Sequence, residues 1–79
     1  MAGKILGAMI GVVVNALDPQ GKGRAQVRLP QLGSDIMSWA RVCRPLGGGP
    51  AGAPQIGVSV VVVFEDGDLS YPIILGRID

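Results

Sequence analysis

The chain has 79 residues, a formal net charge of +1 at pH 7, one cysteine and no histidine. That length allows a single domain, which we expect to span residues 1–79, with a core thin enough that partner subunits are needed to complete it. The near-neutral charge argues against nucleic acid or an anionic membrane as a partner. One cysteine without histidine excludes an internal disulfide and argues against a zinc site, so we expect no cofactor.

The composition favours an all-β fold. Hydrophobic residues make up 48% of the chain, and valine and isoleucine, which favour strands, dominate them. Thirteen glycines and six prolines indicate many turns. The aromatic residues are few: Trp39, Phe64 and Tyr71.

The first predicted element is a long strand over residues 4–17, interrupted by glycine and therefore bent. Gly3, Gly7 and Gly11 would share one face of it, where they allow close backbone packing. The same region has the lysine, apolar run and Val-Asn-Ala of a secretory signal peptide, and a secreted small β protein is the alternative. The apolar run is shorter than the roughly 20 residues that span a bilayer, so we expect no stable membrane insertion.

A loop and a half-buried strand follow. Asp-Pro and two glycines predict a loop over residues 18–23. Residues 24–30 alternate between an apolar and a polar face, which predicts an antiparallel strand closed by a proline. The two faces are Ala25, Val27 and Leu29, and Arg24, Gln26 and Arg28. Residues 31–37 form a connector with room for one helical turn.

The second half of the chain predicts three more strands. Residues 38–45 alternate again, and residues 46–57 hold too much glycine and proline for regular structure. Residues 58–65 are apolar on both faces, as in a strand that is buried on both sides or curled inside a small barrel. Asp-Gly-Asp at residues 66–68 predicts a tight hairpin turn, and residues 71–78 form the returning strand.

Five short strands in so small a chain predict a closed barrel, because closure removes the exposed edges of apolar strands. A long bent first strand is typical of a five-stranded OB-fold barrel, in which it takes part in both halves of the sheet. An SH3-like barrel is the alternative. Pro72 lies near the start of the last strand, where a ladder donor can be spared.

Two patterns resemble binding motifs, and each has a simpler interpretation. Glu65, Asp66 and Asp68 could begin a calcium loop, but the twelfth position from Asp66 is Arg77 rather than a bidentate glutamate. We interpret these acids as a solvated hairpin tip. Residues 47–52 match G-x-G-x-x-G, but prolines and a strand follow where a dinucleotide site needs a helix.

The residues of a catalytic site are not in place. No histidine can act as a base for the serines, and Cys43 lies inside a predicted strand. The acidic residues cluster in turns rather than facing each other across a cleft. We therefore predict that the protein is not an enzyme and has no small-molecule substrate. The serines that lack a histidine base are Ser34, Ser38, Ser59 and Ser70.

An alternative function is a stand-alone OB-type module for single-stranded nucleic acid, which would need a basic groove and stacking aromatics. Four arginines could line such a face: Arg24, Arg28, Arg41 and Arg44. Trp39 is the one aromatic expected near them, since Phe64 is predicted to lie in the core. The simpler interpretation is a solvated face, or ion-pair partners at a subunit interface.

The order of motifs along the chain resembles one family. "GVVVNALDPQGKGRAQVRLP" is followed by "SWARV" and by "PQIGVSVVVVFEDGDLSYPIILGRI". In order and spacing these segments resemble the OB-fold domain of the central spike proteins of contractile injection machines, which include phage baseplate spikes and type VI secretion spikes. The matching residues are Gly11, Asp18, Pro19, Gly23, Arg24, Pro30, Trp39, Ala40, Arg41, Pro54, Gly57, Phe64, Glu65, Gly67, Asp68, Pro72, Leu75 and Gly76.

The resemblance implies a structural role in which three barrels form a platform that joins the tail-tube hub to the spike. We then expect a homotrimer, with a tail hub or tube protein and a separate spike or needle protein as partners. The expected location is the virion tail baseplate, assembled in the bacterial host cytoplasm. In the family the barrel usually continues into a needle, whereas this chain stops at Asp79, so we expect neither membrane piercing nor lytic activity from it.

Apolar residues in or beside predicted loops are the candidate contacts, because they have no obvious place in the core. They are Ile36, Met37, Leu69 and Tyr71.

Overall fold

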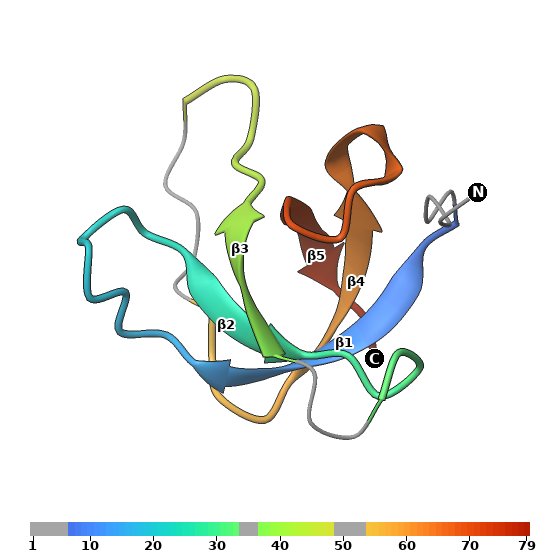
Figure 1. Cartoon of the computed structure of the whole chain (residues 1–79). Coiled ribbons are helices and arrows are strands. Elements are labelled where there is room, and N and C mark those ends of the chain that lie inside the picture. Colours follow the sequence, from blue (N-terminus) through green and yellow to red (C-terminus); the bar gives the residue numbers. More distant parts are fainter. Residues whose placement is uncertain (1–6, 34–36, 49–53) are drawn as a thin grey trace.

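The computed structural model describes residues 7–33, 37–48 and 54–79, and in these ranges the chain is all-β, as predicted (Figure 1). Its elements are β1 (Met9–Asn15), β2 (Ala25–Arg28), β3 (Met37–Val42), β4 (Ser59–Phe64), the short 3-10 turn η1 (Glu65–Gly67) and β5 (Pro72–Arg77).

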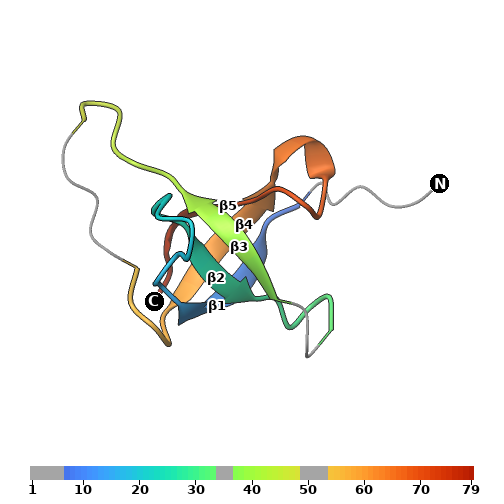
Figure 2. The same cartoon turned by 60° about the vertical axis from the view of Figure 1, so that its left-hand side comes forward.

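The five strands close into a barrel in the order β1-β2-β3-β5-β4. β1 pairs antiparallel with both β2 and β4, β2 with β3, and β4 with β5, while β3 and β5 run parallel. Figure 2 shows the strands crossing one another around the barrel. A first strand shared between the two halves, with a parallel β3–β5 closure, confirms the OB-fold rather than the SH3-like alternative.

The first strand is shorter than predicted, since β1 covers Met9–Asn15 and residues 4–6 lie outside the described part. A bulge bends it as expected: Val13 is opposite Val27, but Asn15 is opposite Gln26. Of the two described glycines that were predicted to allow close packing, Gly11 does so and Gly7 does not. A Cβ on Gly11 would lie 3.2 Å from the Arg28 carbonyl oxygen, whereas Gly7 has open space around it and Gly3 lies outside the described residues.

The core fills the barrel with the inward residues of every strand. Ala25, Val27 and Leu29 are all buried, which confirms the alternation predicted for this strand. In β4 each second residue is buried and the residues between are half-buried, so its outer face is apolar as well. The buried hydrophobic residues are Val13, Ala25, Val27, Leu29, Ala40, Val60, Val62, Phe64 and Ile74.

The β4–β5 connection is a hairpin, but not the single tight turn predicted from Asp-Gly. Asp66 and Gly67 have φ of 53° and 72°, as a type I′ turn requires. A second turn follows, in which the Tyr71 N–H donates to the Asp68 carbonyl at 3.0 Å. The Asp68 carboxylate accepts a hydrogen bond from the Ser70 N–H and stabilises this second turn.

The connector between β2 and β3 begins with successive turns. The N–H of Leu32 donates to the Leu29 carbonyl, and that of Gly33 donates to the Pro30 carbonyl. Residues 34–36, where the rest of the predicted helical turn would fall, lie outside the described residues.

Candidate functional site

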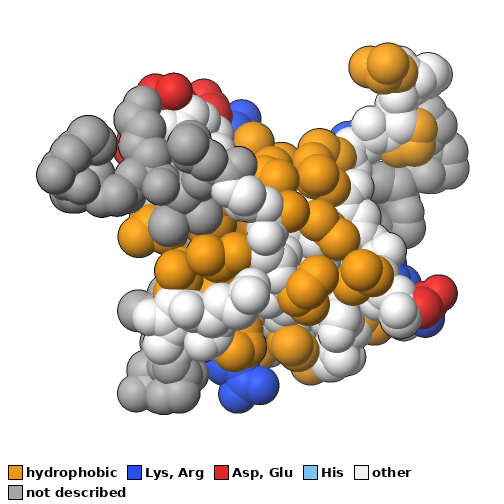
Figure 3. Space-filling view, turned by 90° about the vertical axis from the view of Figure 1, so that its right-hand side faces the viewer, with side chains coloured by type: hydrophobic (Ala, Val, Ile, Leu, Met, Phe, Trp, Pro, Cys, Tyr) orange, Lys and Arg blue, Asp and Glu red, His pale blue; other side chains and the backbone are white. Residues whose placement is uncertain are grey.

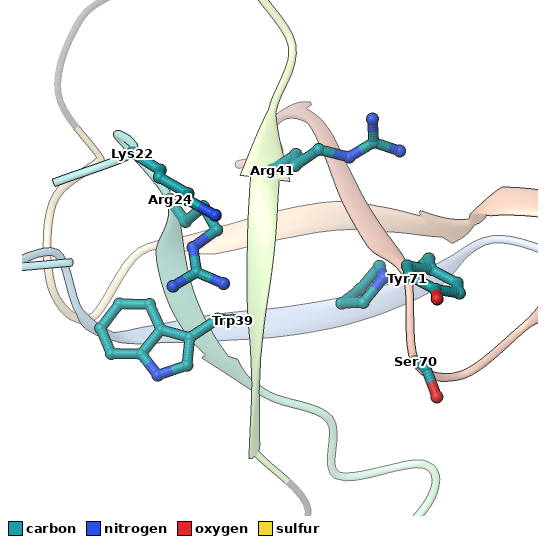
Figure 4. Close-up of a pocket in the computed structure, with 7 residues that line it drawn as sticks. Lys22, Arg24, Trp39, Arg41, Ser70 and Tyr71 are labelled. Atoms are coloured by element: carbon teal, nitrogen blue, oxygen red, sulfur yellow. The ribbon is translucent and has the colours of Figure 1, made fainter. Parts of the chain in front are cut away.

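A groove crosses β3 on the outside of the barrel. It is open on one side, has a volume of about 340 Å³, and lies between the β1–β2 loop and the β4–β5 loop (Figure 4). Arg24 and Trp39 are on one side of β3, and Ser70 and Tyr71 are on the other. The lining residues are Lys22, Arg24, Trp39, Arg41, Ser70, Tyr71 and Pro72.

Asp18 organises the loop on one side of this groove. Its side chain is only 3% exposed, and its carboxylate accepts hydrogen bonds from the backbone N–H groups of Gln20, Lys22 and Arg24 at 2.8–3.2 Å. The Arg24 guanidinium completes the set through Nε and Nη2, at 2.8 and 2.9 Å. The Asp-Pro-Gln-Gly segment therefore folds around a carboxylate rather than around apolar contacts.

This ion pair changes the titration of both partners. The Arg24 guanidinium, together with the three backbone N–H groups, holds the pKa of Asp18 well below its ordinary value. Asp18 in turn raises the pKa of Arg24. The Arg24 guanidinium also lies over the Trp39 ring, 5.6 Å from its centroid, which is the geometry of a cation–π contact. Asp18, Arg24 and Trp39 thus form one connected unit from the loop to β3.

The other arginine of the groove is also paired. Arg41 Nη2 donates to Oε1 of Glu65, the first residue of η1, and both side chains are more than half exposed. The Lys22 side chain makes no hydrogen bond or ion pair with any residue in the described ranges. It is therefore the one cation of the lining that lacks a carboxylate partner there.

The structure brings together only part of the predicted arginine face. Arg24 and Arg41 line the groove, whereas Arg28 and Arg44 do not. Arg28 is exposed at the end of β2. The Arg44 guanidinium lies against the β1–β2 loop, where a Cβ added to Gly23 would be 3.2 Å from Nη2 of Arg44. The ion pairs of Asp18 and Glu65 with these arginines were not predicted, because local periodicity does not relate residues in different segments.

The candidate contact residues lie in two places. Met37, at the start of β3, and Leu69 and Tyr71, in the β4–β5 loop, are 50%, 44% and 57% exposed. Ile36 lies outside the described residues. Six further apolar side chains are exposed that were not predicted as contacts. Those in strands could have been found, because they occupy the outward positions of the strand alternation. They are Ile10, Leu17, Leu46, Ile56, Leu75 and Ile78.

The described residues of the cysteine, acidic and glycine-rich motifs lie in turns and loops. Cys43 was predicted to lie inside a strand, but it follows the last residue of β3 as an exposed free thiol. Within the described ranges there is no group of three or more acidic, cysteine or histidine residues that could hold a metal ion. Of the glycine-rich motif at residues 47–52, only Gly47 and Gly48 are described. No helix in the described part of the chain is long and apolar enough to span a membrane.

The barrel and its groove define the class of the protein. A five-stranded barrel whose outer groove runs over β3, between the β1–β2 and β4–β5 loops, has the ligand-binding face of an OB-fold domain. Residues 9–78 match the family of type VI secretion system/phage-baseplate injector OB domains, and the chain therefore belongs to that family. This confirms the resemblance seen in the sequence and gives the protein a structural place in a baseplate. A search of curated proteins found no match.

Proposed function

We propose that the chain is the OB barrel at the central hub of a phage tail baseplate or related injection machine, where three copies join the tail tube to the spike. The role is mechanical, without catalysis, and the partners are a hub or tube protein and a spike or needle protein. Assembly takes place in the bacterial host cytoplasm, and the mature location is the tail tip. Family membership and one surface of the barrel support this proposal.

The supporting surface is the outer side of β1, β4 and β5, which we call the apolar sheet face. Ile10 is opposite Val61 across β1 and β4, and Val63 is opposite Ile73 across β4 and β5. No outward residue of β1 or β4 carries a charge. Hydrophobic side chains gather over this side of the molecule in Figure 3. Its members are Ile10, Val12, Val61, Val63, Ile73, Leu75 and Ile78.

Contact between copies through this face would bury the additional apolar surface that the small core lacks. Ile10, Leu75 and Ile78 are 41%, 52% and 42% exposed, although they sit in or next to strands of the barrel. A contiguous apolar surface of this kind on a small soluble domain marks a protein–protein contact. In a ring of three copies each barrel would present this face to a neighbour, which is a closed assembly.

The test is the oligomeric state of the purified chain, measured by sedimentation velocity with and without a charge on this face. We expect a trimer, and we expect Ile10→Glu to convert it to monomer while the circular dichroism spectrum stays that of a β protein. Leu46→Glu is the matched control, since Leu46 is fully exposed in a loop away from the face. It should leave the trimer intact.

A chain that is monomeric at all concentrations and is absent from tail-tip density in cryo-microscopy of the particle would overturn the proposal. A monomer that is nevertheless found at the tail tip would keep the baseplate role and remove the trimer. The single-stranded nucleic-acid alternative predicts binding of an oligonucleotide at low salt. The carboxylates paired with Arg24 and Arg41 weigh against it, because they neutralise both arginines of the groove.

A further inference from the structure

The barrel is closed by a short seam between β3 and β5. The parallel register joins only Arg41 to Ile73 and Val42 to Ile74, and the Cys43 N–H donates to the Ile74 carbonyl at 3.0 Å. The first part of β3 therefore pairs with β2 on one edge and with no strand of the described chain on its other edge. The groove crosses β3, and its part that is lined by Ser70 and Tyr71 lies beside this second edge (Figure 4).

Strand alternation decides which backbone groups face the groove. The N–H of Cys43 points toward β5, so the N–H and C=O of Arg41 and of Trp39 lie on the same edge of the strand. The opposite edge of β3 pairs with β2, where Ala40 is opposite Ala25. The main-chain donor and acceptor of Trp39 thus face the groove, at a place where the β5 ladder has not yet begun.

Pro72 is the reason that the ladder stops there. If the β3–β5 register continued by one step, the Trp39 carbonyl would need a donor from residue 72, and proline has no N–H. The hairpin already uses the neighbouring groups: the Tyr71 N–H donates to Asp68, the Tyr71 carbonyl accepts from Glu65, and the Ser70 N–H is bound by the Asp68 carboxylate. Tyr71 and its neighbours cannot turn back to pair with Trp39.

The side chains around this edge suit an extended peptide. Tyr71 lies beside the open edge and is 57% exposed, and the groove continues over β3 to the Trp39 ring, so both offer apolar surface (Figure 4). Among the described residues, seven line the groove, of which three are cationic and none is acidic. Arg24 and Arg41 are held by carboxylates outside the lining, while Lys22 is left without one among the described residues.

We propose that the open edge of β3 receives an extended segment of a partner protein, which adds a strand through the main chain of Trp39 and reaches across β3 along the groove with an acidic side chain to Lys22. Main-chain pairing at a sheet edge provides affinity in this mode, and alternate side chains provide specificity. The proposal goes beyond the baseplate role and does not require it. A peptide is favoured over nucleic acid because a free edge can pair with another main chain, and because two of the three cations are already neutralised.

A positional-scanning library of octapeptides is the probe, with binding followed by fluorescence anisotropy against the assembled protein. We expect an acidic residue to be selected at one position. The best peptide is then N-methylated at alternate residues in both registers. N-methylation in one register should weaken binding about 10-fold or more, and N-methylation in the other should not. The reason is that an added strand pairs with β3 through the N–H groups of one of its edges only. On binding, the Trp39 amide should exchange at least about 10-fold more slowly with solvent.

Lys22→Glu should weaken binding of the acidic peptide by about 10-fold or more, whereas Arg77→Glu, an equal charge reversal outside the groove, should change it less than about 2-fold. The proposal is overturned if no pool binds at about 1 mM peptide. Equal effects of the two N-methylated registers, or a Trp39 amide already protected in the free protein, would also overturn it. Binding of a dT oligonucleotide in place of every peptide pool would assign the groove to nucleic acid instead.

Discussion

The carboxylate of Asp18 and the guanidinium of Arg24 form a bidentate pair at 2.8 and 2.9 Å that closes the β1–β2 loop. The same carboxylate accepts three backbone N–H groups, so one side chain satisfies three main-chain donors of the loop. Arg24 then covers Trp39 on β3. The wall of the groove is thereby fixed before any partner binds.

This pair should make stability depend on pH in the acid range. The pKa of Asp18 lies below its ordinary value of 3.8, so Asp18 stabilises the folded state fully above about pH 5 and loses this contribution as the pH falls toward its lowered pKa. We expect Asp18→Asn to lower the free energy of unfolding at pH 7 and to flatten its decrease between about pH 5 and pH 2. Urea unfolding at a series of pH values measures both effects.

Asp68→Asn is the control for this experiment, because Asp68 is exposed and its side chain caps a different loop. It should lower the free energy of unfolding at pH 7 by less than Asp18→Asn does. The same slope in Asp18→Asn as in the unmodified chain would show that the ion pair contributes nothing to folding.

Gly11→Ala should destabilise the barrel through crowding alone. The added Cβ would lie 3.2 Å from the Arg28 carbonyl oxygen and 3.3 Å from a methyl group of Val62, where β1 crosses the core. We expect a loss of about 1–3 kcal/mol in the free energy of unfolding, measured with urea. Gly7→Ala meets open space and should have little effect, so equal losses in the two variants would contradict the packing argument.

Gly67→Ala should cost about 1–2 kcal/mol for a different reason, the backbone conformation. Gly67 has a φ of 72° in the Asp-Gly turn, a region that a residue with a Cβ adopts only with strain. Gly47→Ala is the matched control, since Gly47 has no positive φ and no neighbour within 4 Å of an added Cβ. Thermal unfolding of the two variants separates the turn requirement from a general effect of losing glycine.

Glu65→Gln should change the free energy of unfolding by less than about 1 kcal/mol, although it removes an ion pair with Arg41. Both side chains are more than half exposed, so water already screens their attraction in the folded protein. Urea unfolding at low and at high salt checks this. A large loss that disappears at high salt would mean that the pair holds the β4–β5 loop against β3 more firmly than its exposure indicates.

Much of the barrel could be predicted from short-range patterns. Ala25, Val27 and Leu29 are buried together because a strand alternates its side chains whatever it pairs with. The Asp-Gly turn also followed from two residues, since a type I′ turn needs positive φ at both positions. Local patterns did not set the strand ends: β1 covers Met9–Asn15, because its pairing with β2 and β4 sets its length.

The site depended on contacts between segments distant in sequence. Four arginines had the right spacing for one face, but only Arg24 and Arg41 reach the groove. The carboxylate that neutralises Arg41 comes from Glu65, 24 positions away. No local pattern contains such a pairing, so the spacing of the arginines did not indicate that two of them are matched by carboxylates.

By itself, the sequence determined the five strands, the buried faces and the family, because alternation and turn chemistry act over a few residues and survive in any arrangement of the strands. The tertiary structure decided that the barrel has an apolar sheet face and an open edge at Trp39. Those features depend on which strands become neighbours and in what register. A proline at position 72 becomes a gap in a ladder only when β5 lies beside β3.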